Sequence, residues 1–263
     1  MTCHGPLRWL DEALHSVRSQ TFQDWELLVV DDGADYALAD WYTNQQWTDS
    51  RVRILSNPRR GRAEALNWAL THSRGTWIAN LDADDLFHPR KLEIQVDMAE
   101  QYSNETVLCS QSLIIRDDWQ PGWNAVADVP YCDDISRAMI HRNLVNHSTV
   151  FAPRALLETM GRYDPTRSSQ IDYELWLRML DRNVVFKRIV CPLGAKRLHR
   201  HQLFESRNRL AYLCKSAQLQ VTYARHFKAG WRTYALIAAK VGYGLLPMPM
   251  RRFLAVRGIA TRS

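Results

Sequence analysis

The chain has 263 residues, of which 46% are hydrophobic and 24% charged, which is enough for a sizeable core in one large domain or one domain with an appendage. The net charge of +6 suits anionic partners such as nucleotide diphosphates, nucleic acid or acidic lipid, and it selects none of them. The 5 cysteines are odd in number and none lie at metal-ligand spacing, so a reduced cytosolic compartment fits better than a disulfide framework. No apolar run reaches the roughly 20 residues of a membrane-spanning helix, and we find no signal peptide.

Helix and strand patterns alternate through the first 115 residues. Residues 25–30 form a continuous apolar run, which predicts a buried parallel strand. The predicted order is helix 7–17, strand 25–30, helix 36–47, strand 52–55, helix 63–72, strand 77–81, a helix from Pro89 and strand 107–115. This alternation predicts an α/β fold with a mostly parallel, doubly wound sheet and flanking helices.

The second half is less regular. Residues 117–148 show no periodic pattern, residues 146–151 predict a returning strand, and residues 173–180 predict a helix. Residues 204–228 predict a further helix. From 231 to 263 the chain is apolar and basic, and glycines and prolines interrupt it.

Three carboxylates, those of Asp82, Asp84 and Asp85, directly follow the predicted strand 77–81. Neighbouring carboxylates repel one another, and a hard divalent cation with oxygen ligands, Mg²⁺ or Mn²⁺, would neutralise them. The carboxyl end of a strand is also where open α/β sheets bind ligands. The alternative is that Asp84 or Asp85 caps the helix near Pro89, although a cap needs only one carboxylate.

A second acidic pair, Asp31 and Asp32, ends the strand 25–30, and the basic loop 59–62 follows the next strand. In a parallel sheet these segments share one edge, so carboxylates and arginines would meet there. That combination predicts a nucleotide-diphosphate site. Neither glycine fingerprint, G-x-G-x-x-G nor G-x-x-x-x-G-K-[ST], is present, which disfavours a dinucleotide dehydrogenase and a P-loop NTPase.

Four segments together resemble glycosyltransferase family 2, in the family's order: residues 13–33, 61–67, 74–93 and 171–178. The second has a glycine followed by Ala-x-Asn, the third contains the Asp-x-Asp motif, and the fourth has the acceptor-side acidic motif. The match covers about residues 2 to 205. It implies a Rossmann-like GT-A fold and inverting transfer from a nucleoside-diphosphate sugar, with UDP as the expected nucleotide. The implied organisation is a domain 1–203, with a donor half 1–115 and an acceptor half 116–203, and a helical extension 204–263.

The resemblance also implies residues for the donor. Asp32 would contact the nucleotide base, and Thr2 would lie near it in the loop after the family's first strand. Arg62, in the basic loop, would face the diphosphate. Asp82 would approach the ribose or the sugar.

It further implies a metal site and a base. Asp84, Asp85 and His199 would hold Mn²⁺ or Mg²⁺, with His201 as a competing assignment for the histidine. Asp172 would be the general base that removes a proton from the acceptor hydroxyl. Taken alone, Asp172 could instead be a helix N-cap.

The acceptor implied by the resemblance is a saccharide or a lipid-linked sugar, in bacterial surface polysaccharide or lipopolysaccharide assembly. We expect a cytoplasmic protein that binds no nucleic acid. Residues 231–263 fit a basic amphipathic segment on the inner face of an anionic membrane, or a helix packed on the domain. A metal-dependent phosphatase built on an Asp-x-Asp pair fits poorly, since its pair lies near the N-terminus.

One departure from the family concerns the start of the chain. Family members open with a buried strand of about six apolar residues, whereas this chain begins Met-Thr-Cys-His-Gly. We therefore expect the first strand to be lacking, which predicts either a start further upstream or a poorly folded form. It also motivates an alternative function, a catalytically weak relic that binds nucleotide sugars.

Overall fold

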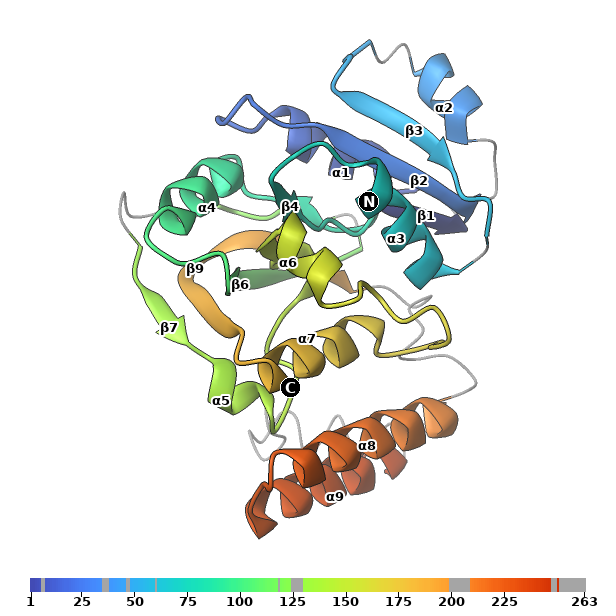
Figure 1. Cartoon of the computed structure of the whole chain (residues 1–263). Helices are drawn as coiled ribbons and strands as arrows, with labels where there is room; N and C mark the ends of the chain where they lie inside the picture. The colour runs from blue at the N-terminus through green and yellow to red at the C-terminus, as the bar shows by residue number, and fades with distance from the viewer. Residues whose placement is uncertain are drawn as a thin grey trace.

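The structure is a computed structural model, in which two sheets, their flanking helices and a C-terminal helical pair follow one another along the chain (Figure 1). It describes residues 1–5, 8–34, 38–45, 48–59, 61–117, 119–123, 130–198, 209–246 and 250.

The first sheet is parallel, in the order β1-β2-β3, and consists of β1 (Thr2–Gly5), β2 (Leu27–Ala34) and β3 (Val52–Ser56). The apolar run that predicted a strand is the buried first half of β2, with Val29 and Val30 fully inaccessible. Helix α1 (Leu10–Arg18) connects β1 to β2, and α2 (Leu38–Asn44) connects β2 to β3. The apolar face of α1 is buried in the same core as β1 and β2, as its amphipathic spacing requires.

The expectation that the first strand is lacking is wrong. β1 pairs with β2 in parallel register, Thr2 opposite Val30. The Met1 ammonium extends the pairing by donating to the Leu28 carbonyl oxygen at 2.9 Å, and Cys3 is fully buried in the core. A short strand with polar residues can form here because backbone groups, rather than a run of apolar side chains, hold it. Within the described ranges no ladder joins β1 to β4.

The second sheet is mixed. Its order is β4-β8-β6-β9-β5, with β7 also paired to β9. Its strands are β4 (Trp77–Ala79), β5 (Leu86–Phe87), β6 (Thr106–Arg116), β7 (Cys132–Asp134), β8 (Phe151–Pro153) and β9 (Val185–Leu198). β6 and β9 are parallel, and the other pairs are antiparallel. The predicted parallel arrangement is therefore confirmed for the first sheet and for the β6–β9 pair.

The remaining helices connect or cover these strands. They are α3 (Arg62–His72), α4 (Lys91–Ala99), α5 (Ser136–Met139), the 3-10 helix η1 (His147–Thr149), α6 (Arg154–Thr159), α7 (Ile171–Asp181), α8 (Arg209–His226) and α9 (Trp231–Leu245). No helix in the described part of the chain is both long and apolar enough to cross a membrane.

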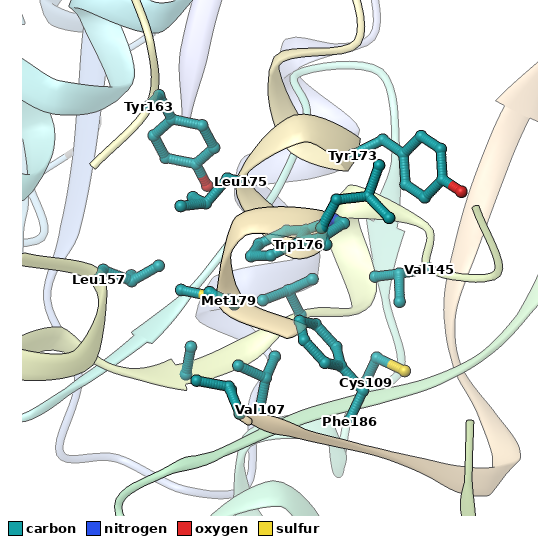
Figure 2. Packing of buried hydrophobic residues seen from close by; sticks show 14 of the residues in the cluster. Val107, Cys109, Val145, Leu157, Tyr163, Tyr173, Leu175, Trp176, Met179 and Phe186 are labelled. Atoms are coloured by element: carbon teal, nitrogen blue, oxygen red, sulfur yellow. The ribbon is translucent and has the colours of Figure 1, made fainter. Parts of the chain in front are cut away.

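Helix α7 is the centre of the largest core. Tyr173, Leu175, Trp176 and Met179 are fully buried, and Figure 2 shows them beside side chains of β6 and β9. The Trp176 and Phe186 rings meet edge to face, with centroids 5.7 Å apart. Leu219 and other residues of α8 belong to the same core, so α7 lies between the second sheet and α8. This packing fixes the N-terminal end of α7, where Asp172 lies.

Candidate active site

The acidic cluster lies in the turn between β4 and β5. Carboxylate oxygens of Asp82, Asp84 and Asp85 all lie within 4.8 Å of one another. The alternative that Asp84 or Asp85 caps the next helix is wrong, because α4 begins at Lys91 with Arg90 in the cap position.

Asp85 is the buried member of the cluster, with 1% exposure. Its Oδ2 accepts a hydrogen bond from Ser148 Oγ at 2.5 Å, and its Oδ1 accepts one from the Arg197 backbone N–H at 2.9 Å. Burial raises the pKa of Asp85, and the neighbouring charges of Asp84 and Asp82 raise it further. Three oxygen-donor side chains this close together fit a hard divalent cation. His199 and His201 lie outside the described residues.

Asp82 has cationic and polar partners. Its Oδ1 accepts hydrogen bonds from Arg62 Nη2 at 2.7 Å and from His147 Nδ1 at 3.0 Å. Burial acts to raise the pKa of Asp82, but Arg62 and His147 outweigh it and hold that pKa well below its ordinary value. Asp82 therefore carries its negative charge beside a guanidinium.

Asp32 shapes the loop that carries Arg62. Asp32 is buried at the end of β2, and its Oδ1 accepts hydrogen bonds from Asn57 Nδ2 at 2.9 Å and from the Gly61 N–H at 2.7 Å. Gly61 has a φ of 121°, a conformation that favours glycine, and α3 begins at the next residue. Asp32 therefore holds in place the loop residue that directly precedes Arg62.

Thr2 lies in a strand rather than in the loop where the sequence placed it. It is the first residue of β1 and pairs with Val30, two residues before Asp32. At the other end of β1, His4 Nδ1 lies 2.8 Å from the Asp32 carbonyl oxygen.

Asp172 is the second residue of α7. It is not the N-cap, because Gln170 takes that position with a left-handed φ of 56°. The carboxylate of Asp172 helps to raise the pKa of Arg62, after the larger effect of Asp82. Arg62 therefore lies within electrostatic range of both carboxylates.

Sequence reasoning missed the residues that hold this site together. Ser148 links two members of the acidic cluster, since Asp82 N–H donates to its Oγ at 3.1 Å while that hydroxyl donates to Asp85. Arg197 is fully buried, and its guanidinium donates to Glu12 Oε2 at 2.7 Å and to the Asp84 carbonyl oxygen at 3.0 Å. Arg197 lies near the end of β9, and its neighbours in the sequence gave only a weak signal of this role.

The family model for glycosyl transferase family 2 matches residues 1–153. The chain belongs to glycosyltransferase family 2. The match includes Asp32, Arg62 and the whole acidic cluster.

Individual family members are similar over part of their length. EpsE of Bacillus subtilis (strain 168), provisionally named a glycosyltransferase, is 28% identical over 180 residues, which is 66% of this chain and 63% of EpsE. WfgD of Escherichia coli, named UDP-Glc:alpha-D-GlcNAc-diphosphoundecaprenol beta-1,3-glucosyltransferase, is 34% identical over 112 residues, 40% of this chain and 44% of WfgD. This family 2 chain thus spans less than two thirds of either relative.

The fold matches that of a solved structure. The crystal structure of S. aureus TarS residues 1–349 in complex with UDP-GlcNAc superimposes with a TM-score of 0.58 and 15% identity, over 83% of this chain and 65% of TarS 1–349. The chain therefore has the GT-A type of architecture, a sheet of parallel and mixed strands with flanking helices, as the sequence predicted.

Proposed function

We propose that this chain transfers a sugar from a nucleoside-diphosphate sugar, UDP-linked, to a hydroxyl group of a saccharide or lipid-linked acceptor, with inversion. The observation that carries the proposal is the acidic cluster with the Arg62 guanidinium bonded to Asp82, and Asp172 lies within electrostatic range of that arginine. Family membership supplies the reaction class. The UDP named for WfgD and for the TarS complex supports the choice of nucleotide.

The donor residues follow from charge and position. Asp32 and Thr2 lie on β2 and β1 and would contact the base and its surroundings, while Arg62 would face the diphosphate. Asp82, fixed through Oδ1, would approach the ribose or sugar. Asp84 and Asp85 would hold Mn²⁺ or Mg²⁺, with His199 as the third ligand. Bound there, the cation supplies Lewis-acid stabilisation of the charge that develops on the departing diphosphate.

Asp172 would act on the acceptor. The acceptor oxygen forms a bond to the anomeric carbon as the bond from that carbon to the diphosphate oxygen breaks, so the configuration inverts in a single displacement. The acceptor hydroxyl loses its proton to the Asp172 carboxylate, which gives a typical general-base contribution of about 10²–10⁴-fold.

Calorimetric titration of UDP tests the donor site. We expect binding in the presence of Mn²⁺ that is lost in Asp84→Ala, and unchanged in the control Asp97→Ala, since Asp97 is an exposed carboxylate on α4. No binding by the unmodified protein with or without Mn²⁺ would contradict UDP as the nucleotide.

The rate of sugar transfer tests the proposed role of Asp172 as the general base. With a UDP-sugar that is transferred, Asp172→Asn should lower kcat by about 10²–10⁴-fold and leave UDP affinity unchanged. Full activity of Asp172→Asn would refute its role. Binding of UDP-sugars without any turnover would indicate the relic, although the formed β1 removes the observation that motivated this alternative.

The cellular location that we propose for this reaction follows from the proposed acceptor. The lipid-linked substrate in the name of WfgD supports assembly of surface polysaccharide at the cytoplasmic face of a membrane. Helix α9 exposes Trp231, Leu236 and Leu245, at 75%, 49% and 59%, and these side chains would contact the membrane. Replacing Trp231 and Leu236 by serine should reduce flotation with anionic liposomes. The matched control is Leu210→Ser on α8, and equal flotation of all variants would contradict the contact.

A further inference from the structure

A chain of buried side chains leads from the acceptor half to Asp82. His147 is 5% exposed and lies between two partners, with Nδ1 3.0 Å from Asp82 Oδ1 and Nε2 3.2 Å from the Tyr163 hydroxyl. The Tyr163 hydroxyl also accepts a hydrogen bond from Asn80 Nδ2 at 3.1 Å. These contacts join segments 65 and 83 residues apart in the sequence.

The distances assign the protons in this chain of contacts. Nδ1 of His147 lies 3.0 Å from Asp82 Oδ1 and 3.3 Å from Arg62 Nη2. Because a carboxylate can only accept and its contact is the shorter one, we assign the Nδ1 proton to the hydrogen bond with Asp82. Asn80 occupies a lone pair of the Tyr163 oxygen, which leaves the hydroxyl proton to donate to His147 Nε2. Tyr163 thereby fixes both the tautomer and the orientation of the ring.

Tyr163 is itself rigidly placed. Asn67 of α3 makes two hydrogen bonds to its backbone, donating to the carbonyl oxygen at 2.8 Å and accepting from the N–H at 3.0 Å. Arg62 lies on the same helix and donates to the same Asp82 oxygen that His147 contacts. Helix α3 therefore reaches Asp82 by two routes, one direct and one through Tyr163 and His147.

Two donors converge on one oxygen of Asp82. Arg62 Nη2 and His147 Nδ1 both bond Oδ1, whereas Oδ2 has no protein donor among the described residues. A carboxylate held at one oxygen from two directions cannot rotate, and the other oxygen keeps a fixed direction. Arg62 alone would hold that oxygen from one direction only.

We propose that His147 is a positioning residue for the sugar donor: it orients the carboxylate of Asp82, and the Tyr163 hydroxyl orients His147. The inference rests on the proposed function, in which Asp82 meets the ribose or sugar of the donor. It adds a role for a residue that touches neither substrate nor metal.

Two amide replacements separate the two sides of the ring. In His147→Asn the amide nitrogen takes the place of Nδ1 and can still donate to Asp82. In His147→Gln it takes the place of Nε2, facing Tyr163 and away from Asp82. Both variants place a polar amide at the same buried position, so a general loss of stability would affect them alike.

The measurement is the affinity for UDP and for UDP-GlcNAc with Mn²⁺ by calorimetry, so that both a ribose and a sugar are presented, beside the thermal midpoint of each variant. We expect His147→Asn to bind within about threefold of the unmodified protein and His147→Gln to lose about tenfold or more, since a hydrogen bond to a charged group is lost. Tyr163→Phe, which removes only a hydroxyl, should lose affinity by a smaller factor. Equal affinity of the Asn and Gln variants would overturn the proposal.

A crystal structure of each variant gives a readout that needs no nucleotide. We expect Asp82 to keep its side-chain conformation in His147→Asn and to change it in His147→Gln, and an unchanged Asp82 in the Gln variant overturns the proposal. If the unmodified protein does not bind UDP, the proposed nucleotide fails, and the two crystal structures still decide the role of His147.

Discussion

Lys91 provides a stability prediction whose size can be calculated. Its side chain is fully buried at the start of α4, where Nζ donates to Gln95 Oε1 at 2.5 Å and lies 4.1 Å from the centre of the Phe87 ring. Among the described residues no carboxylate lies within salt-bridge distance of it. Burial lowers the pKa of Lys91 from 10.5 to about 7, which corresponds to a cost of about 5 kcal/mol for carrying the charge in the folded state.

The perturbation is Lys91→Met, which keeps the length of the side chain and removes the ammonium. Below pH 7 the lysine is protonated in both states, and its full destabilisation is present. Between pH 7 and 10.5 the unfolded chain binds more protons than the folded one, so the stability of the unmodified protein rises with pH. The variant lacks this slope and at every pH leaves Gln95 Oε1 unpaired, at a cost of about 1–3 kcal/mol.

The expected result is that the order of stability of the variant and the unmodified protein reverses as the pH rises. Lys91→Met should be more stable than the unmodified protein by about 2–4 kcal/mol at pH 6, and less stable by about 1–3 kcal/mol above pH 10.5. Urea unfolding at several pH values between 6 and 11 measures both differences. The control is Lys215→Met, because Lys215 is exposed, and its profile should parallel that of the unmodified protein. A parallel profile for Lys91→Met would refute the reasoning.

Two further predictions concern the packing of α9 on α8 and the hydrogen bonds of the buried Arg197. Gly244→Ala should destabilise the protein by about 1–3 kcal/mol, because its Cβ would lie 2.6 Å from Leu213 Cδ1, whereas Gly242→Ala meets nothing within 4 Å and should stabilise α9 by up to about 1 kcal/mol. Thermal unfolding of the two variants should show a lower midpoint for Gly244→Ala and a higher one for Gly242→Ala. A shift of both midpoints in the same direction would contradict the close approach of α9 to α8. Arg197→Met should cost about 3–5 kcal/mol, since it leaves the acceptors of a buried guanidinium unpaired, and an unchanged urea midpoint would contradict that.

The elements with local signals were predicted from the sequence. The apolar run of β2, the spacing of α1 and the carboxylates after β4 each depend on neighbouring residues, and the structure confirms the elements they indicated. The first strand was missed because Thr2–Gly5 has no apolar pattern, and pairing with β2 holds it.

The support of the site could not be predicted for a different reason. His147 meets Asp82 across 65 residues and Arg197 meets Asp85 across 112, and a single sequence carries no signal for such pairs. The motifs therefore identified the side chains that we propose for substrate and metal binding, and only the fold identified the side chains that contact and hold them.

The cap of α7 has a consequence for exchanging parts between family members. Gln170, two residues before Asp172, donates through its side chain to the Tyr212 hydroxyl of α8, and Leu219 of α8 packs into the α7 core. A chimera joined just before α8 would therefore replace the surface that supports the proposed base, even though it leaves Asp172 and the acidic cluster in place. To transplant acceptor preference, the exchanged segment must carry α7 and α8 as one unit.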